Sequence, residues 1–198
     1  MVTDAALAAP RTVVEVVDQA LSAGAPVIQL RNKGESARPL LAIGRELRVL
    51  TREAGALFFV NDRVDVALAL DADGVHLGPD DLPVAAARRI VPEGFLIGRS
   101  ADDTDVARQA VAEGADYIGC GTVFRTSTKA DVGVVIGVEG LSRVARAVDV
   151  PVVGIGGITE DRVEELARSG AAGVAVVGAV MRSTAVGTTV ARLLEAWG

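Results

Sequence analysis

The sequence predicts one α/β domain over residues 1–198, a single (β/α)8 barrel of the TIM type. One pattern recurs along the chain: an amphipathic stretch, a glycine, a short apolar segment and a polar loop. Eight expected strands alternate with helices without a break in composition, as in parallel α/β folds. An open doubly wound sheet is the alternative, because nearly continuous apolar strands suit both architectures. The barrel is favoured because polar clusters follow nearly every strand.

The expected strands are short apolar segments that end in polar residues. The first of them is only the tail of a strand, and we expect it to be short. The third ends in Asn61-Asp62, and the fourth ends in Pro79-Asp80-Asp81. The expected strands are residues 1–4, 27–31, 57–60, 74–78, 95–100, 117–121, 151–157 and 173–178.

The expected helices carry apolar residues three and four positions apart, which gives each helix one buried face. Gly24 ends the first helix in the manner of a left-handed C-cap. Pro39 stands in the first turn of the second helix, where proline is tolerated, and Thr159 caps a later one. The expected helices are residues 11–23, 39–55, 63–70, a stretch from 83, 103–113, 141–148, 159–169, a short turn at 179, and 189–197.

Composition narrows the function classes. Half of the residues are apolar and only 3% are aromatic, so the core is expected to consist of Ala, Val, Leu and Ile. The net charge of -6 argues against a general binder of nucleic acid or of anionic membranes. The single Cys120 excludes an intrachain disulfide and fits a reducing cytoplasm. No signal peptide or membrane-spanning run is visible. Oligomeric state is left open, with a homo-oligomer allowed.

Two carboxylates follow neighbouring strands. Asp62 and Asp81 each stand at the carboxyl end of a parallel strand, where active sites of such folds lie. Mg²⁺ takes one or two carboxylates together with substrate phosphates and water, so this pair is a candidate magnesium site. The alternative is helix capping, since Asp62 and Asp80 or Asp81 directly precede expected helices. Asn61 is either a turn residue or a substrate ligand.

Cations and hydroxyl groups follow other strands. Gln29, Arg31 and Lys33 alternate along an extended segment, so they share one face and suit a diphosphate and the heteroatoms of an aromatic ring. The alternative is a solvated strand end. Ser100 is a candidate phosphate donor or turn residue. Arg99 is a candidate phosphate clamp or ion-pair partner.

The loops after the sixth, seventh and eighth expected strands contain residues suited to phosphate binding. Residues 126–129 contain Thr126, Thr128 and Lys129, which form either a phosphate clasp or a solvated loop. Gly156-Gly157 and Gly178 let backbone N–H groups approach an anion, and barrels often bind phosphate after strands seven and eight. His76 is the only histidine and lies inside a strand, as a pocket wall or core residue. No catalytic triad is available with one histidine and one cysteine.

Five segments resemble the thiamine-phosphate synthase family in order and position. They are QLRNK at 29–33, NDRVDVALALDADGVHLGPDD at 61–81, GCGTVFRTSTKAD at 119–131, VVGIGGI at 152–158 and GVAVVGAV at 173–180. The resemblance implies a (β/α)8 barrel that joins hydroxymethylpyrimidine diphosphate to thiazole phosphate and releases diphosphate.

The resemblance also implies residue roles. It assigns Mg²⁺ to Asp62 and Asp81. It predicts that the pyrimidine diphosphate is bound by Gln29, Arg31, Lys33, Asn61, Ser100 and Lys129. It predicts that the thiazole phosphate is bound by Thr126, Thr128, Gly157, Val177 and Gly178. The implied mechanism is dissociative, with Arg31, Lys33, Ser100 and Lys129 as the catalytic side chains, and it needs no nucleophile or general base.

The chain departs from the family pattern at four positions. Family members usually carry proline where Thr122 and Arg125 stand, a small apolar residue at Arg99 and a serine at Gly178. The related thiazole tautomerase shares the barrel, places a catalytic histidine at the position of Thr122 and often lacks the aspartate pair. This chain keeps the pair and lacks that histidine, so synthase is favoured. A tautomerase-type isomerase and a non-catalytic phosphate-ligand binder are the alternatives.

Overall fold

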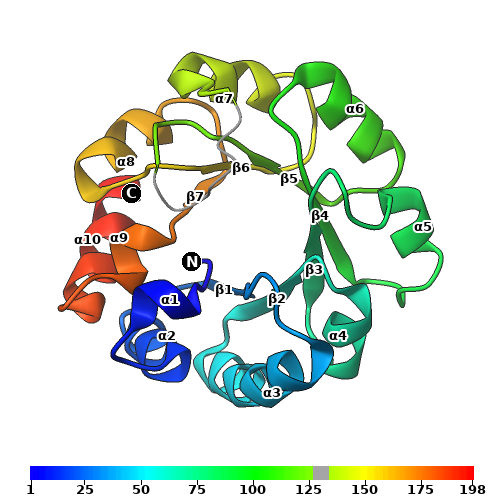
Figure 1. The fold of residues 1–198 in the computed structure, drawn as a ribbon. Coiled ribbons are helices and arrows are strands. Elements are labelled where there is room, and N and C mark those ends of the chain that lie inside the picture. The colour runs from blue at the N-terminus through cyan, green and yellow to red at the C-terminus, as the bar shows by residue number, and fades with distance from the viewer. Residues whose placement is uncertain (127–133) are drawn as a thin grey trace.

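Parallel strands form the inner wall of the protein and helices surround them (Figure 1). The computed structural model describes residues 1–126 and 134–198. Within those residues seven parallel strands pair in sequence order, each with the next. The strands are β1 (Val27–Leu30), β2 (Leu57–Asn61), β3 (Gly74–Leu77), β4 (Leu96–Ser100), β5 (Tyr117–Cys120), β6 (Val152–Ile155) and β7 (Gly173–Ala175).

Helices connect successive strands on the outside. The last of them, α10, packs between α8 and α2 and completes the outer ring (Figure 1). In the described part of the chain none of these helices is long and apolar enough to cross a membrane. The helices are α1 (Ala5–Ala8), α2 (Val13–Ser22), α3 (Ala37–Ala54), α4 (Val64–Ala69), α5 (Val84–Arg88), α6 (Thr104–Ala112), α7 (Gly137–Ala145), α8 (Glu160–Ala167), α9 (Gly178–Met181) and α10 (Val186–Trp197).

The first residues of the chain join the two ends of the sheet. Val2 forms an isolated parallel bridge with Gln29 of β1, and its N–H donates to Val176 just after β7 at 2.9 Å. The pairing stops at Thr3, because Asp4 accepts a hydrogen bond from Leu7 and starts α1. The barrel architecture is confirmed, but the expected count of eight strands is not, since residues 1–4 contribute one bridge rather than a strand.

The alternation of strand side chains separates the core from the site. Side chains on the outer face of the sheet are almost completely buried and pack against helix residues such as Leu47, Leu141 and Leu166. These outer-face residues are Ile28, Leu30, Phe58, Val60, Val75, Leu77, Ile97, Ile118 and Cys120. The intervening positions face the interior of the barrel, where Gln29, Asn61, His76 and Ser100 line a cavity. The core is therefore apolar outside the sheet, and the polar residues lie inside it.

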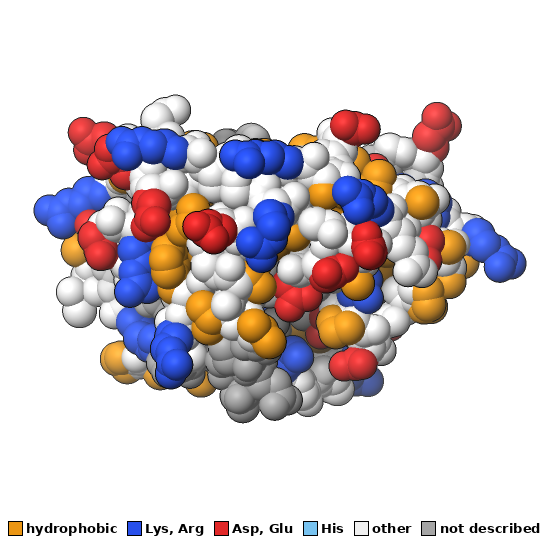
Figure 2. Space-filling view, turned by 90° about the horizontal axis from the view of Figure 1, so that it is seen from above, with side chains coloured by type: hydrophobic (Ala, Val, Ile, Leu, Met, Phe, Trp, Pro, Cys, Tyr) orange, Lys and Arg blue, Asp and Glu red, His pale blue; other side chains and the backbone are white. Residues whose placement is uncertain are grey.

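The outer surface carries both signs of charge. The face in Figure 2 shows Lys and Arg side chains interspersed with Asp and Glu, with separate hydrophobic side chains between them. No single-sign field dominates the part of that face that the structure describes, which is typical of a surface exposed to water.

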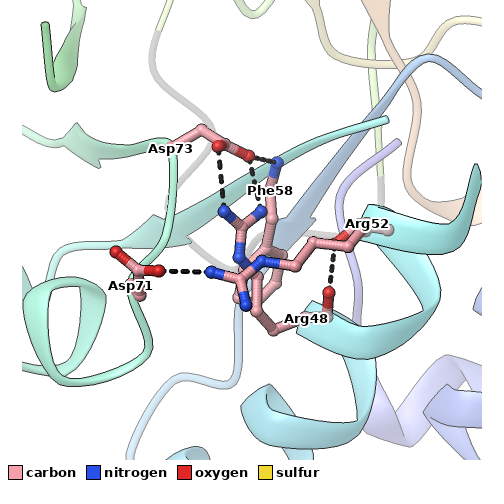
Figure 3. Close-up of polar contacts among 6 residues, drawn as sticks. Arg48, Arg52, Phe58, Asp71 and Asp73 are labelled. Carbon is pink, nitrogen blue, oxygen red and sulfur yellow. Dashed lines mark hydrogen bonds and ion pairs between the residues drawn. The ribbon is translucent and has the colours of Figure 1, made fainter. Parts of the chain in front are cut away.

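A partly buried ion pair joins α3 to the amino end of the sheet. Arg48 of α3 donates two hydrogen bonds to Asp73, at 2.8 and 3.1 Å, and Asp73 also accepts from the Phe58 N–H of β2 at 2.7 Å (Figure 3). The same arrangement recurs two strands later, where Asp116 binds Arg88 and the Ile97 N–H. Each aspartate thus joins one helix to the start of a strand, and neither contact is visible in a sequence pattern.

This arrangement gives a stability prediction. We expect Asp73→Ala to destabilise the fold by about 2 kcal/mol, because it leaves a mostly buried guanidinium and a strand N–H unpaired. For a chain of this size the melting temperature should fall by roughly 4–8 °C. Differential scanning calorimetry measures it.

Asp71→Asn is the matched control, because asparagine removes the charge and tolerates the left-handed backbone of Asp71, whose φ is 51°. Asp71 pairs with Arg52 of the same helix, but the two side chains are 84% and 56% exposed, against 27% and 14% for Asp73 and Arg48 (Figure 3). Exposed pairs contribute little, so its melting temperature should change by less than about 2 °C. Equal effects of the two substitutions would contradict the role given to Asp73.

Candidate active site

A cavity of about 1380 Å³ extends through the interior of the barrel, and its lining includes residues at the carboxyl ends of the strands, such as Asp62 and Gly157, and at their amino ends, such as Leu57 and Pro151. The sequence-predicted residues that the structure describes all line it, although they come from seven different loops and strands. They are Gln29, Arg31, Lys33, Asn61, Asp62, Asp81, Ser100, Thr126, Gly157, Val177 and Gly178. Thr128 and Lys129 lie outside the described residues. The structure therefore places the described set along one cavity, and their binding roles stay predictions.

Arg31 is held in place from two sides. Thr3, which is fully buried, donates to the Arg31 carbonyl at 3.1 Å and accepts from the Arg31 N–H at 2.9 Å. The guanidinium lies 3.8 Å from the carboxylate of Asp4, which starts α1. The backbone and the side chain of Arg31 are thus both fixed by the first residues of the chain, next to Lys33 on the same cavity wall.

The two aspartates predicted to bind metal lie close together. Asp62 has a backbone φ of 65°, uncommon for a residue other than glycine, and its N–H donates to the His76 carbonyl at 2.8 Å. Asp81 accepts the Gly78 N–H at 2.6 Å. Burial raises the pKa of Asp62 to about 6, and a hydrogen bond and charge repulsion from Asp81 act in the same direction, against weaker attraction to Lys33 and Arg31. Below about pH 6 the two carboxylates therefore share a proton, and above it both are ionised.

Capping does not account for either aspartate. The N-cap positions of the helices that follow are Arg63 and Pro83, and neither cap has a side-chain hydrogen bond. The strained backbone at Asp62 and the close approach of two acids cost stability, and such features concentrate at functional sites. The geometry therefore favours the site interpretation over the capping alternative.

A chain of polar side chains crosses the interior. The two ring nitrogens of His76 lie 2.9 Å from the Tyr117 hydroxyl and 2.9 Å from the Ser100 hydroxyl. Tyr117 also hydrogen-bonds Gln29, and burial raises its pKa, so the phenol stays protonated. His76 is thus a pocket-wall residue, as expected, and it fixes the position of Ser100. Tyr117 was not predicted as a site residue.

Two strand glycines make room for these rings. A Cβ on Gly98 would lie 2.1 Å from the Tyr117 ring, and a Cβ on Gly119 would lie 2.7 Å from the His76 ring. Both distances are shorter than van der Waals contact. Glycines in the middle of strands are therefore the one signal in the sequence that could have indicated large side chains crossing the barrel here.

The wall of the cavity after β6 and β7 is built largely from backbone. Gly156 and Gly157 follow β6 with φ of 107° and 63°, and a Cβ on Gly157 would lie 2.5 Å from the Arg125 carbonyl oxygen. Only glycine fits so close an approach in this conformation. Val177 and Gly178 follow β7, where Val177 is the N-cap of the single-turn helix α9.

Arg99 contacts the end of β3, with its guanidinium 3.3 Å from the Leu77 carbonyl oxygen.

The donor set fits magnesium better than a transition metal. In the described part of the chain there is no group of three or more His, Cys, Asp or Glu side chains that could hold a metal ion by itself. The pair Asp62 and Asp81 offers only oxygen ligands, and a cation between them would relieve the repulsion that raises the Asp62 pKa. Mg²⁺ is bound through one or two carboxylates plus substrate phosphate, so this pair fits it.

Comparison with known proteins decides the family. A profile described as thiamine monophosphate synthase matches residues 1–180. The chain belongs to the thiamine monophosphate synthase family. It is 48% identical to the thiamine-phosphate synthase of Moorella thermoacetica over 185 residues. The aligned region covers 93% of this chain and 88% of that protein. It is 54% identical over 165 residues to the enzyme of Pyrococcus horikoshii, covering 83% and 79%.

Solved structures agree with this family. The thiamine phosphate pyrophosphorylase of Pyrococcus furiosus superposes with a TM-score of 0.89 at 45% identity, over 98% of this chain and 93% of that one. A 3-hexulose-6-phosphate synthase superposes with a TM-score of 0.71 at 15% identity, over 100% and 99%. The second match shows the barrel fold alone.

The raised pKa of Asp62 gives a pH prediction for the metal-free protein. The folded pKa of about 6 exceeds the ordinary value of 3.8, so the folded state binds a proton more tightly than the unfolded state between these values. Stability should therefore fall as pH rises through this window and level off above it. Asp62→Asn removes this titration, and asparagine tolerates the left-handed backbone.

Thermal melts in chelator test this expectation. The melting temperature of Asp62→Asn relative to the unsubstituted protein should rise between pH 4 and pH 7. Asp71→Asn, which removes an exposed carboxylate beside Arg52 at the opposite end of the barrel, corrects for the change in net charge. A difference between Asp62→Asn and the unsubstituted protein that stays constant over this range would rule out the shared proton.

Proposed function

We propose that the protein is a thiamine-phosphate synthase. It joins 4-amino-2-methyl-5-hydroxymethylpyrimidine diphosphate to 4-methyl-5-(2-phosphoethyl)thiazole and forms thiamine phosphate and diphosphate. The observation that carries the proposal is the meeting of three groups in one cavity: cations after β1, paired acids after β2 and β3, and glycine turns after β6 and β7. The family membership of the chain supports the same reaction.

The diphosphate has a defined place in this proposal. Arg31 and Lys33 supply positive charge, and Asn61 of β2 and Ser100 of β4 supply neutral donors. The guanidinium suits bidentate contact with phosphate oxygens, and its fixed backbone reduces the entropy lost on binding. Because His76 fixes the Ser100 hydroxyl at 2.9 Å, this donor is oriented before the substrate arrives. Lys129 is a further proposed ligand from outside the described residues.

Asp62 and Asp81 would hold Mg²⁺ together with oxygens of the diphosphate. When bound, the ion neutralises charge on the leaving diphosphate. The two carboxylates must both be ionised to hold it, so protons compete with the metal below about pH 6, where Asp62 takes up a proton. Lys33 and Arg31 favour the ionised form of Asp62 and so lower this competition.

The proposed coupling is dissociative. The bond between the pyrimidine methylene carbon and the diphosphate oxygen breaks first, and the electron pair leaves with the diphosphate. The thiazole nitrogen then donates its lone pair to the pyrimidine-methyl cation and forms the new C–N bond. Gln29, Tyr117 and the edge-stacked Phe59 line the cavity around the pyrimidine in this proposal. No side chain takes up a proton or becomes a nucleophile, so catalysis depends on positioning and electrostatics.

The tautomerase-type alternative has little support in this site. Its catalytic histidine would stand at Thr122, which lines the cavity but has no ring nitrogen to move a proton. The single histidine, His76, is engaged between Tyr117 and Ser100. We therefore place the protein among the synthases.

The proposed location is the cytoplasm. The buried free thiol of Cys120 is consistent with such a reducing compartment, where the phosphorylated substrates are expected.

A product assay tests the function. The purified protein, both substrates and Mg²⁺ should yield thiamine phosphate, detected by chromatography. Asp62→Ala should lower kcat by about 100-fold or more, because a ligand to the charge-neutralising ion is lost. Asp71→Asn should keep full activity, since this exposed carboxylate precedes β3 and does not line the cavity. Absence of product with the unsubstituted protein, despite ligand binding, would indicate a non-catalytic binder. Isomerisation of the thiazole carboxylate precursor alone would indicate the tautomerase.

A further inference from the structure

Arg162 contacts two loops of the cavity at once. It stands in the first turn of α8 and lines the cavity. Its guanidinium donates to the Gly157 carbonyl in the β6–α8 loop at 2.7 Å. The same guanidinium stacks over the ring of Phe124 in the β5–α7 loop, 4.5 Å from the ring centroid. One side chain therefore joins the loop of Gly157 to the loop of Thr126.

The two loops are also joined through their backbones. The Phe124 N–H donates to the Gly156 carbonyl at 3.0 Å. Because the peptide unit is planar, fixing the Gly156 carbonyl also fixes the direction of the Gly157 N–H. The Gly157 carbonyl, held by Arg162, fixes the next peptide unit in the same way. Arg162 thus acts on both peptide units of the turn, on one directly and on the other through Phe124.

In the part of the chain that the structure describes, Arg162 forms no ion pair, although its charge helps to lower the pKa of the exposed Asp161 beside it. Within residues 1–126 and 134–198, no carboxylate oxygen lies within 4 Å of its guanidinium nitrogens. A cation on the wall of a cavity attracts an anion inside it, and a guanidinium also stacks on an aromatic face more favourably than an ammonium group does. Arg162 therefore combines a positive charge with a fixed position beside the glycine turn.

We propose that Arg162 is a positioning residue for the phosphate of the thiazole substrate and a determinant of the preference for the phosphorylated thiazole. It orients the Gly156-Gly157 turn and adds a positive charge beside it. This inference rests on the proposed synthase function, because that function places the thiazole phosphate at Gly157. It assigns no role to Arg162 in binding the pyrimidine diphosphate, whose proposed ligands among the described residues lie on β1, β2 and β4 and in the loop after β1.

Steady-state kinetics of matched variants test the assignment. Arg162→Ala should raise KM for the thiazole phosphate roughly 10- to 100-fold, as for loss of a charged hydrogen bond. KM for the pyrimidine diphosphate should stay unchanged. The preference for the phosphorylated over the unphosphorylated thiazole should fall by a similar factor. Arg162→Lys should restore part of the loss, because it keeps the charge but not the planar stacking group.

Arg168→Ala is the matched control on the same helix. Arg168 pairs with Glu164 at the surface and its side chain is 76% exposed, so its removal should leave both KM values unchanged. Phe124→Leu keeps the Gly157 hydrogen bond and removes the stacking face, so it should shift KM for the thiazole phosphate in the same direction by a smaller factor. This variant keeps the inference testable if Arg162→Ala fails to fold.

The outcomes separate this inference from the proposed function. A protein that makes no thiamine phosphate contradicts the function, and calorimetric titration with the thiazole phosphate then shows whether binding still depends on Arg162. If Arg162→Ala leaves KM for the thiazole phosphate unchanged, or raises both KM values equally, the positioning role is wrong. A change of the same size in Arg168→Ala would also overturn it.

Discussion

Sequential pairing of parallel strands is the constraint on which this site depends. Because every described strand runs in the same direction, all carboxyl ends lie at one rim, and side chains far apart in the sequence meet there. The register sets which residues are neighbours: Asn61 of β2 pairs with His76 of β3, and Ser100 of β4 pairs with Gly119 of β5. A shift of one residue in any strand would turn its polar side chains out of the cavity and into the helical layer.

Charge at the rim differs from the charge of the protein as a whole. The chain carries a net charge of -6, yet Arg31, Lys33 and Arg162 line the same cavity. Asp62, which follows the strand next to β1, lies close enough to Asp81 for the second carboxylate to raise its pKa further. A pair of acids facing cations suits a ligand that has negative oxygens and brings a divalent cation with it. The global charge therefore predicts which partners are avoided, and the local arrangement predicts which ligand is bound.

The sequence predicted those features that local patterns determine. Apolar segments and glycines indicated the strands, and polar residues at strand ends indicated the rim, because both depend on a few neighbouring residues. Tyr117, Asp73 and Arg162 were missed, because each acts on a residue distant in the sequence, and nothing beside them indicates the partner. The eight-strand count failed for a local reason: Asp4 caps a helix and ends the pairing after one bridge. The roles of Thr128 and Lys129 stay predictions.

Two parts of the cavity must keep a fixed separation for the proposed reaction. The acids and cations stand on loops after β1 to β3, and the glycine turns stand after β6 and β7. A dissociative coupling creates a short-lived cation, so the thiazole nitrogen must already be near the methylene carbon when the diphosphate leaves. The chain from Tyr117 through His76 to Ser100 links β3, β4 and β5 inside the barrel, and Arg162 links the loops after β5 and β6. In the proposed reaction, rigid contacts between adjacent strands would hold both substrates without a moving catalytic group, so a site whose one described histidine is engaged still suits this chemistry.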